Sequence, residues 1–119
     1  MKVLPNGDFV VAASEAITFK VRRKNTPCQA SFDCAGWASC GPVTDTDDHT
    51  KVKTCTATRN SGDESLCTIT VDFRQDASGT FDPTDRYTVE ITGSHDGSFT
   101  EDFTPPPVLN GRTYHFTVE

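Results

Sequence analysis

The chain has 119 residues, enough for one domain with its own core but too few for two ordinary domains. Its net charge of −6 argues against nucleic acid and anionic membrane surfaces as partners, because phosphate groups are bound by clustered Lys and Arg. No stretch approaches the roughly 20 apolar residues that a membrane-spanning helix needs, so membrane insertion is not expected either. The one basic run, residues 20–24, is interpreted as a solvated strand end.

Alternation of apolar and polar residues predicts a series of short β-strands. The abundant Thr, Ser, Asp and Gly suit such strands joined by polar turns. In chain order, strands are expected at residues 9–13, 17–21, 51–58, 66–73, 87–92, 99–103 and 114–118. Residues 25–50 are expected to be irregular, apart from a short helical turn near residues 30–32. About seven strands without a convincing helix predict an antiparallel β-sandwich.

Two of the five cysteines have a spacing that suggests a covalent link. Cys55 and Cys67 lie at equal distances from Ser61, at the centre of the turn signal Asn60-Ser61-Gly62-Asp63. If that turn closes a β-hairpin, the two thiols oppose each other across the ladder. The sequence therefore predicts a disulfide between Cys55 and Cys67.

The other three cysteines, Cys28, Cys34 and Cys40, are spaced six residues apart. We predict one disulfide among these three, with the remaining thiol either buried or available to bridge to another chain. No tight C-x₂-C pair supports a zinc site, and no local signature supports a catalytic cysteine.

Structural disulfides place the protein outside the cytosol, because such bonds persist only in oxidising compartments. We therefore expect a secreted, periplasmic or cell-surface protein. Residues 1–7 include no hydrophobic stretch of a signal peptide, so either an upstream region has been removed or the protein is cytosolic and its cysteines have another role. The structural character of the cysteine placement favours the first explanation, and we expect residues 1–119 to be a single β-sandwich domain excised from a longer exported protein.

Two segments in the last third of the chain resemble known extracellular modules. The segment Phe81-Asp82-Pro83-Thr84-Asp85-Arg86-Tyr87-Thr88-Val89-Glu90-Ile91 resembles the corner and strand of fibronectin type III and related immunoglobulin-like domains. Residues 108–118, from Val108 to Val118, are similar to the bacterial version of that same strand. Both cannot occupy the same place in one sandwich. If the first match holds, the chain end is similar instead to the closing hairpin of carboxypeptidase-regulatory or prealbumin-like modules.

The resemblance implies a bacterial-style extracellular immunoglobulin-like module, of the kind that forms one bead in a larger surface or secreted protein. Together with the predicted disulfides, this gives the expected fold, a disulfide-stapled immunoglobulin-like β-sandwich. Such a fold does not define a function. We expect a non-catalytic binding or spacer module that recognises a protein or glycan partner through its loops. The alternative is a carbohydrate-binding module.

The alternative depends on Trp37 and on an acidic tract. Trp37 is the only Trp, and either it packs against a disulfide or it is exposed on a stapled loop and stacks on a sugar or partner. Asp45, Asp47 and Asp48 offer the oxygen ligands that Ca²⁺ prefers, although the EF-hand pattern is absent and a solvated acidic loop would look the same.

Enzymatic activity is not expected. His49, His95 and His115 are scattered over predicted loops and outward strand positions, and no nucleophile elbow accompanies them. We therefore predict no catalytic residue and no cofactor beyond the Ca²⁺ just considered. Tyr87 and Tyr114 are expected to pack in the core with their hydroxyls bonded to nearby backbone.

Overall fold

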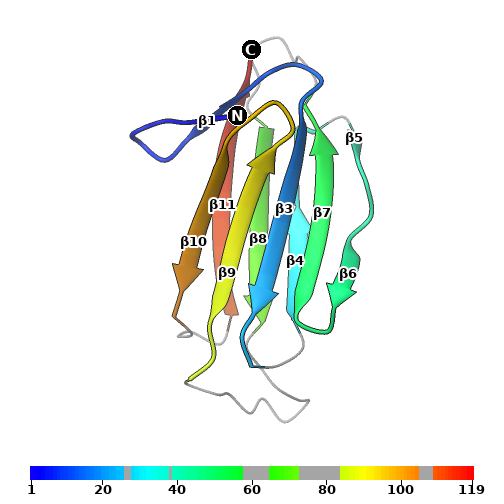
Figure 1. The fold of residues 1–119 in the computed structure, drawn as a ribbon, viewed down its shortest axis with the longest axis vertical. Helices are drawn as coiled ribbons and strands as arrows, with labels where there is room; N and C mark the ends of the chain where they lie inside the picture. Colours follow the sequence, from blue (N-terminus) through cyan, green and yellow to red (C-terminus); the bar gives the residue numbers. More distant parts are fainter. Residues whose placement is uncertain (26–27, 38, 58–64, 73–83, 105–108) are drawn as a thin grey trace.

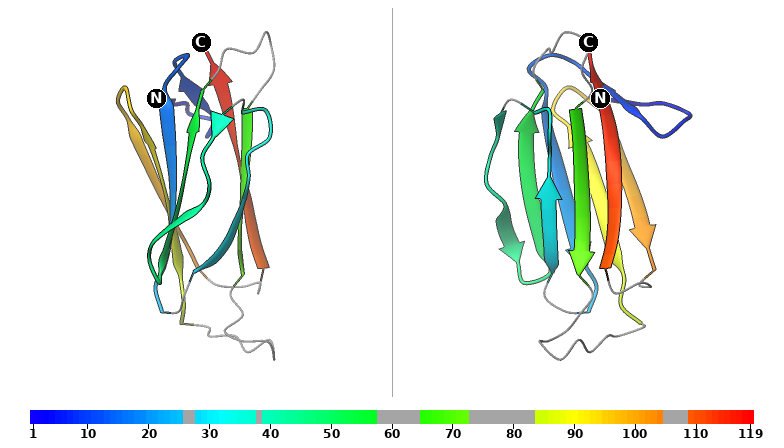
Figure 2. Two further views of the ribbon diagram at one scale, coloured as in Figure 1. Left: turned by 90° about the vertical axis from the view of Figure 1, so that its right-hand side faces the viewer. Right: turned by 180° about the vertical axis from the view of Figure 1, so that it is seen from behind.

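A computed structural model describes residues 1–25, 28–37, 39–57, 65–72, 84–104 and 109–119, which form two packed β-sheets (Figure 1). The edge-on view in Figure 2 separates the two layers. None of the described residues belongs to a helix, let alone one that could span a bilayer, and the predicted all-β class is confirmed. The strands are β1 (Lys2–Val3), β2 (Phe9–Val11), β3 (Ala16–Arg23), β4 (Gln29–Asp33), β5 (Ser39–Cys40), β6 (Thr44–Asp47), β7 (Thr50–Thr56), β8 (Ser65–Asp72), β9 (Tyr87–Gly93), β10 (Ser98–Phe103) and β11 (Leu109–Val118).

The two sheets differ in their strand order. Sheet A has the order β1-β2-β11-β8-β4, and sheet B has the order β10-β9-β3-β7-β5, with β6 also paired to β7. The described pairs are antiparallel, except that β2 and β11 run parallel to each other, which departs from the predicted antiparallel sandwich. Parallel neighbours require a long connection, and nearly the whole chain lies between these two strands.

Seven of the strands lie where alternation predicts them, namely β2, β3, β7, β8, β9, β10 and β11. The predicted total of about seven is nevertheless wrong, because the described residues also form β1, β4, β5 and β6. The predicted helical turn near residues 30–32 is strand β4 instead. These four strands have no buried residues, so the apolar alternation that reveals a strand in sequence is weak or missing.

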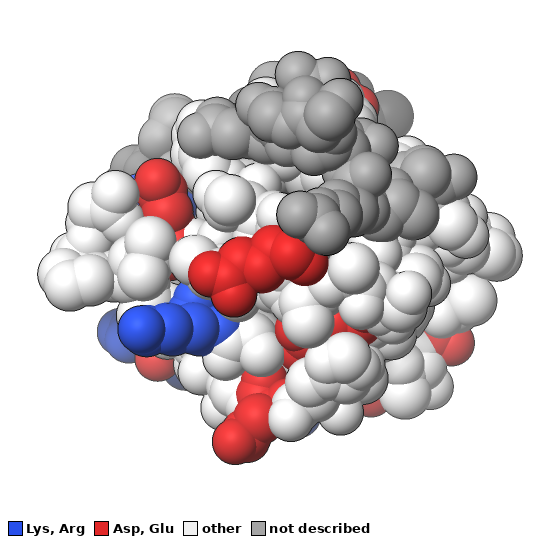
Figure 3. All heavy atoms as spheres, turned by 90° about the horizontal axis from the view of Figure 1, so that it is seen from above, with Lys and Arg blue, Asp and Glu red and all other residues white. Residues whose placement is uncertain are grey.

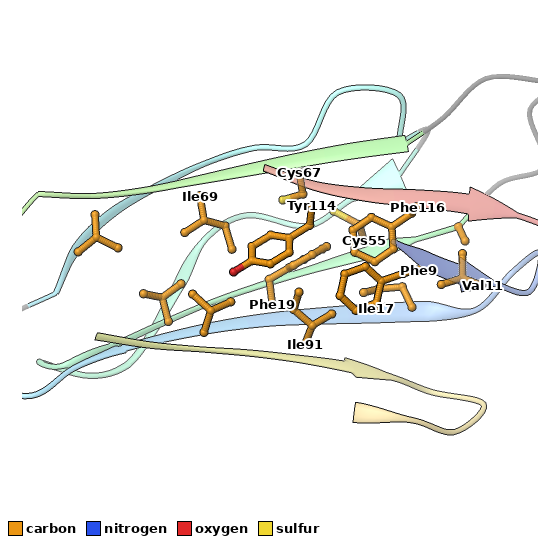
Figure 4. Packing of buried hydrophobic residues seen from close by; sticks show 14 of the residues in the cluster. Phe9, Val11, Ile17, Phe19, Cys55, Cys67, Ile69, Ile91, Tyr114 and Phe116 are labelled. Carbon is orange, nitrogen blue, oxygen red and sulfur yellow. The ribbon is translucent and has the colours of Figure 1, made fainter. Parts of the chain in front are cut away.

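The core lies between the sheets and consists of the inward-facing residue of each alternating pair (Figure 4). In β3, Ile17, Phe19 and Val21 are buried, whereas the residues between them are partly exposed. Phe116 from sheet A contacts Phe19 from sheet B edge to face, with 5.6 Å between ring centroids. Burial of these side chains between two sheets is the main source of the fold's stability.

Both predicted core tyrosines are buried. Tyr87 Oη donates a hydrogen bond to the side-chain oxygen of Asn110. Tyr114 Oη is buried and has no hydrogen-bond partner among the described residues. Tyr87 thus bonds to a residue of the opposite sheet, since Asn110 lies in β11 and Tyr87 lies in β9.

The predicted cysteine pairing is wrong. Cys55 lies in β7 of sheet B and Cys67 lies in β8 of sheet A, so the two strands do not form a hairpin ladder. The predicted turn at residues 60–63 lies outside the described residues. The structure instead has the disulfides Cys34–Cys67 and Cys40–Cys55, and neither joins two members of the set Cys28, Cys34 and Cys40. Cys28 is the free, buried cysteine.

Each disulfide joins neighbouring strands of one sheet. Cys40 is the register partner of Cys55 between β5 and β7. Cys34 directly follows Asp33, whose register partner Thr68 lies next to Cys67. As the sequence prediction assumes, bonded cysteines oppose each other across paired strands. The strands that pair, however, are not joined by the predicted hairpin turn. The two intramolecular bonds support an oxidising, extracytoplasmic environment for this protein.

Removing the Cys40–Cys55 bond should destabilise the domain measurably. The bond closes a loop with a sequence separation of 15, and such loops correspond to about 3 kcal/mol in the chain-entropy account. We expect the double substitution Cys40→Ala and Cys55→Ala to lower the free energy of unfolding by about 2–4 kcal/mol in urea denaturation. In strong reductant the unsubstituted chain should lose most of this advantage. Equal stability of both chains without reductant would contradict the pairing.

Candidate functional site

Trp37 lies in the loop between β4 and β5 and closes one side of the core. Its ring contacts Phe19 and Phe116, with centroid distances of 6.0 and 5.1 Å. Its Nε1 donates a hydrogen bond of 3.1 Å to the backbone oxygen of Leu66. These contacts favour the packing role among the two interpretations of Trp37. Stacking on a sugar stays a prediction that depends on the part of the ring that remains exposed.

The predicted acidic tract forms strand β6 and the turn that follows it. Lys51 Nζ lies 2.7 Å from Asp45 Oδ1, and the two residues are register partners. The carboxylate of Asp47 accepts a 2.7 Å hydrogen bond from the backbone N–H of His49, which lowers the pKa of Asp47. The backbone oxygen of Asp48 accepts a hydrogen bond from Cys28.

No metal site is preassembled in the described part of the chain. No group of three or more His, Cys, Asp or Glu side chains there could hold a metal ion. A Ca²⁺ site formed by Asp45, Asp47 and Asp48 therefore stays a prediction, and two of these carboxylates already have other roles.

The three histidines lie on separate elements. His49 belongs to the turn before β7, and His95 belongs to the turn between β9 and β10, at the other end of the sandwich in Figure 1. His115 is exposed on β11. The fold thus does not bring the candidate proton-transfer groups to one place.

A buried ion pair that the sequence analysis did not identify joins three strand ends. The Arg23 guanidinium donates to the carboxylate of Asp85, and both side chains are almost fully excluded from solvent. Arg23 Nη1 also donates to the backbone oxygen of Asp72 at 2.7 Å. Asp85 Oδ1 accepts from the backbone N–H groups of Asn25 and Arg86, at 3.0 and 2.8 Å. The pair therefore connects the ends of β3 and β8 to the start of β9.

Two opposing effects act on the pKa of Asp85. Burial raises it, because a charged group loses its hydration. The hydrogen bonds from Arg23, Asn25 and Arg86 outweigh burial and lower the pKa below its usual value. Asp85 is therefore ionised in the folded protein at neutral pH.

The strand alternation that buries Arg23 and Asp85 turns their neighbours outward. Arg22 and Lys24 flank Arg23, Arg86 follows Asp85, and all three are exposed. Lys24, directly after β3, donates its backbone N–H to the backbone oxygen of Arg86, directly before β9, at 2.9 Å, so the two residues are neighbours. The outer face of sheet B thus brings Arg22 and Lys24 together with Arg86, which lies far from them in sequence.

These cations line a hollow of about 430 Å³, which we call the basic hollow; its lining residues are Arg22, Lys24, Arg86, Thr88 and Asp102. The β-sheet register places Arg22, Thr88 and Asp102 in one row across β3, β9 and β10. Thr88 Oγ1 donates to Asp102 Oδ1 at 2.6 Å. Within the described residues, none of the three cations forms an ion pair.

A second hollow of about 530 Å³ opens between β10 and β11. Its Arg112 lies 3.2 Å from the Glu101 carboxylate and 5.6 Å from the centre of the Phe103 ring. Its positive charge is therefore already compensated within the chain. The basic hollow differs in that its cations lack such partners in the described structure.

The charge of the surface is not uniform. At the end of the molecule that carries both termini, Asp and Glu predominate among the visible charged side chains (Figure 3). The basic hollow lies toward the other end, where β3 finishes and β9 begins (Figure 1). A concentrated positive site on a chain of net charge −6 is a candidate for ligand recognition.

The chain matches no protein-family model, no curated protein and no solved structure.

Substitution of Asp85 by Asn should reveal the contribution of the buried pair. The substitution removes the charged partner of a buried guanidinium, so we expect a loss of about 3–5 kcal/mol in the free energy of unfolding at pH 7. The lowered pKa means that Asp85 stabilises the fold above its unfolded pKa of about 3.9, and that this contribution is lost as pH falls through the folded pKa.

The stability difference between the original chain and Asp85→Asn should therefore be constant near neutral pH and shrink below about pH 4. Urea denaturation from pH 7 to pH 2 measures it. Asp33→Asn removes the same charge at an exposed position and serves as the matched control. A pH-independent difference would show that the Asp85 carboxylate does not stabilise the fold through its charge.

Proposed function

We propose that the chain is a non-catalytic binding module of a secreted or cell-surface protein, built on an immunoglobulin-like sandwich. The connectivity supports the fold assignment, because the chain repeatedly passes between the sheets, from β3 to β4, from β7 to β8 and from β8 to β9. Such crossings are typical of the Greek-key connections of immunoglobulin-like domains.

The two segments that resemble such domains fall in different sheets. Residues 87–91 lie in β9 of sheet B, and residues 109–118 lie in β11 of sheet A, so one strand position need not accommodate both. Residues 81–83 and 108 lie outside the described residues.

The proposed binding function depends on the basic hollow. Three cations against the single carboxylate of Asp102 leave an excess of positive charge in the hollow, and that excess costs self-repulsion, whereas the buried cation Arg23 has a clear structural role. The hollow lies on paired strands of sheet B, one of whose central strands, β7, is tied by a disulfide. Recognition residues on a rigid scaffold lose little conformational freedom on binding. The sequence predicts recognition through loops, and this proposal adds a binding surface on the outer face of sheet B.

The proposal can be tested with the chain immobilised on a biosensor and presented with neutral polysaccharides, anionic polysaccharides and proteins, each with and without Ca²⁺. We expect saturable, reversible binding of one class, and mass spectrometry should show that the ligand is released unchanged. No saturable binding by any class, or a cleaved or modified ligand, would contradict a non-catalytic binding module.

Intrinsic fluorescence separates the two candidate surfaces, because Trp37 is the only Trp, packs against the core rings of Phe19 and Phe116, and does not line the basic hollow. Binding at the basic hollow should leave the Trp37 emission maximum unchanged. A shifted emission on addition of a neutral glycan, together with a Ca²⁺ requirement, would instead support the carbohydrate-binding alternative at Trp37 and the acidic tract.

A further inference from the structure

We propose that the basic hollow binds an anionic carbohydrate, a hydroxyl-rich chain that carries carboxylate or sulfate groups. This inference rests on the proposed binding function and names the ligand class of the same site. Its basis is the combination of three unpaired cations with one carboxylate and one hydroxyl in a single hollow.

The cations supply the attraction for the acid groups of the ligand. Arg22 and Arg86 each present a planar fork of N–H donors, which matches the two oxygens of a carboxylate or sulfate. Lys24 adds a compact ammonium group beside Arg86. In the next row along the sheet, Lys20 is the register partner of Glu90, so that row carries one charge of each sign, unlike the hollow with its three cations and one carboxylate.

Asp102 indicates that the ligand also donates hydrogen bonds. One carboxylate oxygen of Asp102 accepts from Thr88, and this contact holds the side chain in the row with Arg22. A carboxylate would repel a simple anion, which offers only acceptors. A sugar hydroxyl can donate to the second oxygen of Asp102 while an acid group on the same chain contacts Arg22 or Arg86. A charged sugar fits both parts of the hollow.

The lining favours a carbohydrate over an acidic polypeptide. Protein interfaces depend on a few buried aromatic or aliphatic anchors, and the described lining contains only Arg, Lys, Thr and Asp side chains. The exposed large hydrophobic residues among the described ones are Val3 and Val43, and neither lines the hollow. An extracytoplasmic location also suits anionic polysaccharides as ligands.

The direct test compares polymers that differ in one property. Polygalacturonate carries carboxylates and hydroxyls, its fully methyl-esterified form keeps the hydroxyls without the charge, polyacrylate carries carboxylates without hydroxyls, and a sulfated galactan replaces carboxylate by sulfate. We expect polygalacturonate, the sulfated galactan or both to bind, with affinity that falls as salt rises, and the esterified polymer to bind at least tenfold more weakly. A preference between the two acids identifies which acid group the site takes.

Single substitutions then locate the binding. Arg86→Ser should lower the affinity for the bound polymer about tenfold, because one charge-assisted contact is lost. Lys2→Ser changes the net charge equally at an exposed residue outside the hollow and should leave the affinity within about twofold. Equal losses for both variants, or unchanged binding by Arg86→Ser, would overturn the assignment of the hollow. Circular dichroism melting curves confirm that both variants are folded.

Asp102→Asn distinguishes a sugar site from general attraction to polyanions. Removing a negative charge should strengthen the binding of polyacrylate. If Asp102 accepts sugar hydroxyls, the same variant should weaken binding of the charged polysaccharide severalfold. Stronger polysaccharide binding by Asp102→Asn would overturn the proposal. Failure of every anionic polysaccharide, while another class binds in the screen above, would refute this inference and leave the binding function intact.

Discussion

The buried ion pair between Arg23 and Asp85 is the constraint on which the arrangement of the candidate site depends. A guanidinium and a carboxylate that are both removed from water must remain in contact, since separating them would leave two uncompensated charges in the core. Asp85 also accepts two backbone hydrogen bonds, and Arg23 bonds to the end of β8. These contacts fix the side-chain alternation at the end of β3 and the start of β9, so the adjacent cations must face outward.

The disulfides have a complementary role at the sheet edges. Strands β4 and β5 have no fully buried residue, so hydrophobic burial holds them only weakly. One disulfide links the end of β4 to β8, and the other links β5 to β7. Polar edge strands avoid pairing with other molecules, and a covalent bond to the neighbouring strand allows them to stay polar. The two edge strands, of five and two residues, thus stay attached to their sheets without adding fully buried residues to the core.

The charge distribution connects these structural features to the proposed function. The positive charges of Arg23 and Arg112 are compensated by carboxylates of the same chain. The cations of the basic hollow are held close together by the ladder between β3 and β9, in spite of their repulsion. Backbone hydrogen bonds resist that repulsion, and a ligand with acid groups would relieve it. The site is preorganised in the sense that sheet pairing, and not the ligand, assembles it.

Local sequence determined the strands whose apolar residues alternate, the all-β class and the exposed end of the basic run at Arg22 and Lys24. These properties follow from the two-residue period of a strand and from the cost of burying charge, both of which act over a few residues. Only the tertiary structure decided that Cys55 bonds to Cys40, that Arg23 is buried and that Arg86 completes the basic hollow. Each of these depends on which strands become neighbours, and that choice is made by the packing of two whole sheets, because many pairings satisfy the same local pattern.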